Sequence, residues 1–106
     1  MTDTKLNTTV APLAAIPPGE GRVFHIAGER IAVFHARTGQ VFATQADCPH
    51  KAGPLADGIL GGTTLVCPLH SWKFDLTTGE AQGTDCRLKT YAAEVDANGL
   101  VTLLLR

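Results

Sequence analysis

Short apolar runs separated by glycine-containing turns make up the first half of the sequence. Gly28-Glu29 and Thr38-Gly39 separate three such runs, which cover residues 22–27, 31–36 and 41–44. Apolar runs of this length, bounded by turn residues, are typical of antiparallel strands joined by hairpins. The pattern therefore predicts a β-meander in this part of the chain.

The two ends of the sequence carry the same kind of pattern. The apolar run 10–16 ends at Pro17-Pro18-Gly19 and predicts an edge strand closed by a breaker. Near the C-terminus, runs over 89–95 and 100–105 flank Asn98-Gly99, the pair that a type I′ hairpin turn prefers. No window shows a sustained helical period. The prediction is an all-β fold, a sandwich or barrel of short strands.

The stretch over residues 45–83 differs from its flanks. It has turn signals at Asp57-Gly58 and Gly61-Gly62, and a short hairpin is predicted around Thr77-Thr78-Gly79. We interpret about 45–83 as a subdomain inserted between the two halves of the β sandwich or barrel. The whole chain, residues 1–106, is predicted to be a single domain, because its length and its 44% of hydrophobic residues suit one globular unit.

Charge and hydropathy exclude several classes of protein. The formal net charge of −1 leaves no basic stripe of the kind that releases counterions from phosphate, so a nucleic-acid partner is not expected. The polar start over residues 1–9, which we expect to be flexible, is followed by no long apolar run. Neither a signal peptide nor a membrane span is therefore predicted. These features favour a cytoplasmic protein whose partners are proteins or small redox molecules.

Two short motifs in the 45–83 stretch combine cysteine with histidine. They are Cys48-Pro49-His50 and Cys67-Pro68-Leu69-His70, with sixteen residues between His50 and Cys67. The proline after each cysteine fixes φ at about −65° and favours the sharp turn that a shared metal site needs. Three cysteines, an odd number without an export signal, favour metal ligation over a disulfide framework. We therefore predict that Cys48, His50, Cys67 and His70 bind one metal cofactor.

Two kinds of cofactor accept two cysteines and two histidines. A structural zinc ion binds them tetrahedrally, but zinc motifs commonly pair Cys with Cys and His with His. Here each motif mixes the two residue types, which favours an iron–sulfur cluster. A zinc-binding interaction module is the alternative interpretation.

The order Cys-x-His, sixteen residues, Cys-x-x-His resembles the Rieske family of 2Fe-2S proteins, and the resemblance covers most of the chain. It implies a Rieske-like β sandwich or barrel with one 2Fe-2S cluster per chain. It further implies that Cys48 and Cys67 bind one iron and that His50 and His70 bind the other. Because neutral imidazoles replace two thiolates, the reduction potential lies above that of four-cysteine ferredoxins. The implied function is electron transfer.

Two positions after the second motif bear on the reduction potential. Rieske proteins that oxidise quinols carry a serine and a tyrosine there, whose hydroxyls donate to the cluster sulfurs, whereas this chain has Trp72 and Phe74. Since those donors stabilise the reduced cluster, we expect a potential at the low end of the Rieske range, about −150 mV.

Within the Rieske family, residues 48–58, 61–70 and 74–80 are most similar to the small subunit of cytoplasmic NAD(P)H-dependent nitrite reductases. That resemblance implies an oxidoreductase of nitrate assimilation, whose large subunit holds flavin, a 4Fe-4S cluster and siroheme and reduces nitrite to ammonium. The alternative is a Rieske ferredoxin of an aromatic-ring-hydroxylating dioxygenase. Such ferredoxins typically have Cys-Thr-His and Ser-Leu where this chain has Cys-Pro-His and Gly-Pro-Leu. In both cases the chain alone carries electrons and holds no catalytic residue.

Three further residues with metal-binding side chains are left out of the site. Cys86 stands alone and is predicted to be a small buried residue. His25 and His35 lie within alternating strands and are predicted to lie on strand surfaces.

Overall fold

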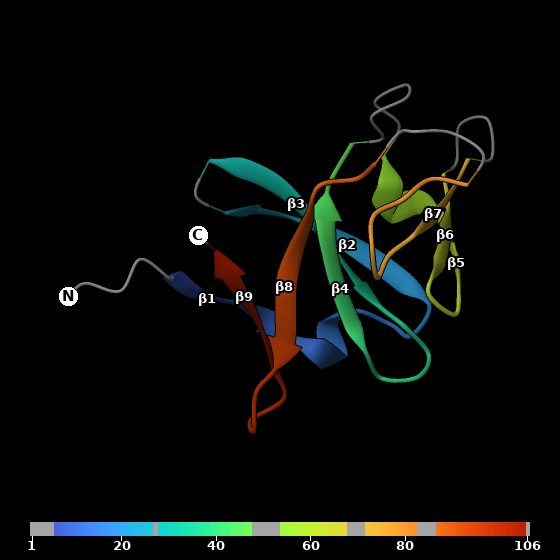
Figure 1. The fold of residues 1–106 in the computed structure, drawn as a ribbon. Helices are drawn as coiled ribbons and strands as arrows, with labels where there is room; N and C mark the ends of the chain where they lie inside the picture. Colours follow the sequence, from blue (N-terminus) through green and yellow to red (C-terminus); the bar gives the residue numbers. More distant parts are fainter. Residues whose placement is uncertain (1–5, 27, 48–53, 68–71, 83–86, 106) are drawn as a thin grey trace.

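Nine β-strands and two short 3₁₀-helices form the part of the chain that the structure describes (Figure 1). The computed structural model describes residues 6–26, 28–47, 54–67, 72–82 and 87–105. The larger sheet contains β1 (Leu6–Pro12), β2 (Glu20–Ile26), β3 (Glu29–His35), β4 (Val41–Gln45), β8 (Thr90–Val95) and β9 (Leu100–Leu105). The remaining elements are β5 (Ile59–Gly61), β6 (Thr64–Val66), β7 (Lys73–Asp75), η1 (Leu13–Ala15) and η2 (Leu55–Asp57).

The larger sheet is antiparallel, with the strand order β1-β9-β8-β4-β3-β2, and it curls into a nearly closed, barrel-like shape. Its two edge strands, β1 and β2, face each other across a hollow of about 330 Å³. The smaller sheet has the order β5-β6-β7 and lies to one side of the barrel (Figure 1). The predicted all-β fold is confirmed.

Strand β3 is buried on both faces. Ile31 and Val33 contribute to the core inside the barrel, whereas Ala32 and Phe34 contribute to a second core. This division follows from strand geometry, because successive side chains point to opposite faces of a sheet. One run of four buried apolar residues therefore serves two cores.

The second core lies between β3 and the smaller sheet. Leu65 of β6 and Phe74 of β7 are fully buried in it together with Phe34. Strand β2 approaches this core so closely that a Cβ on Gly21 would lie 2.6 Å from the Phe34 ring. Any larger residue at that position would displace the ring and disturb the packing that holds the smaller sheet to the barrel.

The hairpin between β8 and β9 is confirmed, but the predicted type I′ turn at Asn98-Gly99 is wrong. The backbone N–H of Gly99 donates to the Asp96 carbonyl (3.0 Å), so the turn has Ala97 and Asn98 at its centre. Gly99 follows with a φ of 79°. The Asp96 carboxylate accepts hydrogen bonds from the backbone N–H groups of Asn98 (2.8 Å) and Leu100 (3.0 Å). This side-chain cap favours the longer loop, in which glycine follows the turn.

The first strand lies earlier in the chain than predicted. We expected a strand over residues 10–16 after a flexible start, but β1 begins at Leu6 and gives way to η1 after Pro12. β1 is an edge strand, as expected, and its pairing with β9 stops opposite Leu100, the residue at which β9 begins. Backbone hydrogen bonds to the other end of the chain therefore determine where β1 lies, and a local hydrophobic pattern does not report them.

Replacement of Phe74 by alanine tests the second core. Because Phe74 is fully buried, its truncation should lower the free energy of unfolding by about 3–5 kcal/mol. Ile59→Ala is the matched control, since Ile59 belongs to the same small sheet but is 73% exposed, and its loss should stay below about 1 kcal/mol. Urea unfolding of both variants measures the difference. Equal losses would contradict the packing described here.

The turn after β7 should make stability depend on acidic pH. The side-chain hydroxyl of Thr77 (2.6 Å) and its backbone N–H (2.9 Å) donate to the Asp75 carboxylate and lower the pKa of that carboxyl. A carboxyl with a lowered folded-state pKa stabilises the fold above its unfolded-state pKa, and this stabilisation is lost as pH falls through the folded-state value. Asp75→Ala should therefore reduce stability at pH 7, and the difference from the wild type should shrink below about pH 4. Urea unfolding across this range checks it, and a difference that persists undiminished at pH 2 would contradict it.

Candidate metal centre

Cys67 is the predicted ligand that lies within the described residues. It directly follows β6 and its side chain is 1% exposed. It belongs to the second core together with Ala46 and Leu55, and Trp72 packs against the same core. Cys48, His50 and His70 lie outside the described residues, as does Cys86.

The chain closes on itself at the base of each predicted ligand motif. Before and after the first motif, Asp47 and Pro54 form an antiparallel bridge, and the Leu55 N–H donates to the Ala46 carbonyl (3.0 Å). At the second motif, the Cys67 N–H donates to the Trp72 carbonyl (2.7 Å). Each motif is therefore part of a short segment whose two ends are joined by backbone contacts.

The bases of the two segments lie near each other. Figure 1 shows that β4 and β6, which lead into the first and second segments, run toward the same end of the molecule. Ala46 after β4 and Cys67 after β6 lie in one buried cluster. The fold therefore brings together the starting points of two motifs that are distant in sequence.

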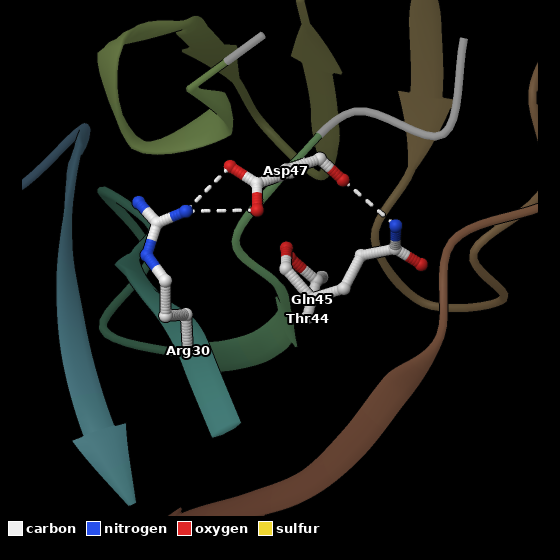
Figure 2. Close-up of polar contacts among 4 residues, drawn as sticks. All are labelled: Arg30, Thr44, Gln45 and Asp47. Atoms are coloured by element: carbon white, nitrogen blue, oxygen red, sulfur yellow. Dashed lines mark hydrogen bonds and ion pairs between the residues drawn. The ribbon is translucent and has the colours of Figure 1, made fainter. Parts of the chain in front are cut away.

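An exposed ion pair includes the residue that precedes the first motif. One guanidinium nitrogen of Arg30, on β3, donates to both carboxylate oxygens of Asp47 (Figure 2), and both distances are 2.8 Å. The Ala46 N–H also donates to the Arg30 carbonyl (3.2 Å). Both side chains of the ion pair are about half exposed, at 49% and 44%, so water and salt screen their attraction.

A second set of interacting polar side chains lies at the start of β8 and consists of Glu29, Lys89 and Tyr91. The Tyr91 hydroxyl donates to Glu29 (2.6 Å) and lowers the pKa of that carboxyl, to which Lys89 adds a hydrogen bond and its positive charge. The same contacts to Tyr91 and Glu29 raise the pKa of Lys89. Lys89 therefore stays charged and lies 5.1 Å from the centre of the Tyr91 ring.

Of the two histidines left out of the site, His25 is exposed on β2, as predicted, whereas His35 on β3 is half-buried. The His35 Nδ1 atom donates to the Ile16 carbonyl (2.6 Å), which is a structural contact, and His25 lines the hollow between β1 and β2.

Within the described ranges, no three His, Cys, Asp or Glu side chains gather closely enough to hold a metal ion. In the same part of the chain, no helix has the length and apolar character that a membrane crossing needs.

Comparison with known families identifies the fold and the cofactor. The sequence model of the Rieske [2Fe-2S] domain matches residues 7–92, which is most of the chain. The chain belongs to the Rieske [2Fe-2S] domain family. One 2Fe-2S cluster per chain and an electron-transfer role follow from that membership, so both expectations are confirmed.

The described residues fit a Rieske cluster. The Cys67 thiol is buried among apolar side chains. This surrounding makes Cys67 a suitable ligand, because it would exclude water from a bond between the sulfur and iron. Trp72 and Phe74 pack with ring centroids 6.4 Å apart, and neither side chain supplies a hydroxyl. The low reduction potential expected from these two residues stays a prediction.

Two groups of relatives resemble this Rieske domain. A ferredoxin component of the naphthalene 1,2-dioxygenase/salicylate 5-hydroxylase systems of Ralstonia sp is 35% identical over 88 residues, which cover 81% of this chain and 84% of that protein. A protein described as a candidate NADPH nitrite reductase small subunit is 28% identical, with a TM-score of 0.85 over 94% of this chain and 99% of that one. The fold is also shared with a candidate NADH-dependent nitrite reductase small subunit from Mycobacterium tuberculosis, which is 22% identical, with a TM-score of 0.90 over 98% of both chains.

Proposed function

We propose that Cys48, His50, Cys67 and His70 bind the 2Fe-2S cluster, with the two cysteines on one iron and the two histidines on the other. When bound, the cluster takes up and releases single electrons. The chain itself supplies the ligands and the buried, apolar surrounding of Cys67. We further propose that residues 1–106 form one domain, in which about 45–83 is the cluster-binding subdomain.

The backbone contacts that join the two ends of each motif-bearing segment support this ligand set most directly. The first motif lies between Asp47 and Pro54, which are bridged, and the second lies at Cys67 and Trp72, which share a backbone hydrogen bond. A short segment whose ends are joined has fewer conformations than an open chain of the same length. Restricting the ligands in advance lowers the conformational entropy that cluster binding costs.

We propose that the chain is the small subunit of a cytoplasmic NAD(P)H-dependent nitrite reductase. Two observations support this function: the similarity of residues 48–58, 61–70 and 74–80 to that subunit family, and the 28% identical neighbour that covers 94% of this chain. The partner would be a large subunit with flavin, a 4Fe-4S cluster and siroheme that reduces nitrite to ammonium. In that assembly the chain carries electrons and performs no bond chemistry.

A dioxygenase ferredoxin is the second candidate. The observation in its favour is the 35% identity over 88 residues to the ferredoxin component from Ralstonia sp. In that role the chain would carry electrons from a reductase to an oxygenase. The Cys-Pro-His and Gly-Pro-Leu sequences at 48–50 and 53–55, unlike those of typical dioxygenase ferredoxins, favour the nitrite reductase subunit.

Loss of the Cys67 thiolate should abolish the cluster. Cys67→Ser replaces the sulfur that iron prefers by a hydroxyl, so we expect a colourless protein without acid-labile sulfide. Cys86→Ser is the matched control, because Cys86 is not among the proposed ligands, and it should keep the wild-type iron content. Iron and sulfide analysis with visible absorption measures both. An unchanged spectrum in Cys67→Ser would remove this residue from the site.

Reconstitution with each candidate partner separates the two functions. Added to a siroheme-containing large subunit, the holo chain should raise nitrite-dependent NAD(P)H oxidation, and Cys67→Ser should not. A flavin reductase with a mononuclear-iron oxygenase should show little ring hydroxylation with the same holo chain. The opposite result, ring hydroxylation without any effect on nitrite reduction, would show that the chain is a dioxygenase ferredoxin.

A further inference from the structure

The side-chain amide of Gln45 holds the peptide group that leads into the first ligand motif. Its Nε2 atom donates to the Asp47 carbonyl (2.7 Å), as Figure 2 shows. That carbonyl belongs to the peptide unit between Asp47 and Cys48. Because a peptide unit is planar, a contact that orients its carbonyl orients the whole unit.

The other end of the same amide is anchored to a different part of the chain. The Gln45 Oε1 atom accepts a hydrogen bond from the backbone N–H of Lys89 (2.8 Å), and the Gln45 N–H donates to the Lys89 carbonyl (2.9 Å). The Gln45 backbone is also paired with Ile31 of β3. The amide therefore extends from a residue fixed on two sides, and both its donor and its acceptor are engaged.

The Arg30–Asp47 ion pair is a second contact at Asp47, made to its side chain, and we expect it to orient the following peptide less strongly. Its two side chains are 49% and 44% exposed, and ion pairs of that exposure contribute about 0–1 kcal/mol. Gln45 is half-buried, so water screens the hydrogen bond from its amide to the Asp47 carbonyl less than it screens the ion pair. The orientation of the peptide therefore depends more on Gln45 than on Arg30.

We propose that Gln45 is a positioning residue for the cluster: it couples the start of the first ligand segment to the backbone at Lys89 and fixes the peptide that precedes Cys48. This role rests on the proposed function, because it requires Cys48 to be a ligand. Gln45 acts through Cys48 and does not contact the cluster itself in this proposal. Residues that hold metal ligands in place commonly change metal affinity by about 10–100-fold when they are lost.

Gln45→Glu separates positioning from a purely structural role. The glutamate keeps an oxygen that accepts from the Lys89 N–H, but it places a second oxygen, in place of the donor, against the Asp47 carbonyl. Gln45→Met, of similar size, removes both side-chain hydrogen bonds. Because the Gln45 backbone stays paired on both sides, we expect both variants to fold.

Two control variants accompany them. Thr44 is fully buried next to Gln45, and its hydroxyl donates to the Gln45 carbonyl (2.8 Å). Thr44→Val removes this hydrogen bond but leaves the contact between Gln45 and the Asp47 carbonyl in place. It should lower stability and leave the cluster unchanged. Arg30→Met removes the ion pair and should change cluster release by no more than about fivefold, in keeping with its exposure.

The readouts are the rate of iron release to a chelator from the oxidised holo protein, the EPR spectrum of the reduced protein, and urea unfolding. We expect iron release to be about 10–100-fold faster in Gln45→Glu and Gln45→Met, with altered EPR g-values. Release rates and g-values equal to those of the wild type in Gln45→Glu would overturn the proposal. The proposal would also be overturned if Thr44→Val changed the iron-release rate and the g-values as much as Gln45→Glu does. That result would show that any loss of stability speeds iron release.

The ligand assignment is tested separately. If Cys67→Ser and Cys48→Ser both keep the wild-type cluster, the proposed function fails, and positioning through Cys48 fails with it. If both lose the cluster while Gln45→Glu releases iron at the wild-type rate, the ligand set stands and only the role of Gln45 is wrong.

Discussion

The burial of strand β3 on both faces is the constraint on which the rest of the structure depends. Ile31 and Val33 belong to the barrel core, and Ala32 and Phe34 belong to the second core, against which the smaller sheet packs. Two cores that share one strand cannot shift independently, because a change in the position of β3 disturbs both. The smaller sheet is therefore held in a fixed place relative to β4, the strand that leads into the first ligand motif.

This arrangement explains how two motifs separated by sixteen residues can serve one cofactor. The barrel supplies the start of the first segment at Asp47, and the smaller sheet supplies the start of the second at Cys67. Backbone contacts join the two ends of each segment, so the proposed ligands belong to short segments with joined ends. The same second core that joins the sheets also buries the Cys67 side chain.

The sequence predicted the features that local patterns encode. Glycine turns and alternating runs located the hairpins, and the spacing of Cys and His pointed to the Rieske family, to which the chain belongs. The features that it could not predict depend on contacts between distant residues. The start of β1 at Leu6 depends on pairing with β9, and the contact of Gln45 with Lys89 joins residues 44 positions apart. The turn at Asp96 was missed because a side-chain cap outweighed the preference of the Asn-Gly pair. Three of the four predicted ligands lie outside the described residues, so their assignment still depends on their spacing and family membership.

This fold holds a 2Fe-2S cluster, and the proposed ligands combine two cysteines with two histidines. The most direct test is the low-temperature EPR spectrum of the reduced protein, purified without oxygen, together with its iron, sulfide and zinc content. A Rieske cluster should give equal amounts of iron and sulfide, a red-brown colour and a Rieske-type signal in the reduced state. A colourless protein that binds zinc and contains no sulfide, even after reconstitution with iron and sulfide, would contradict this assignment.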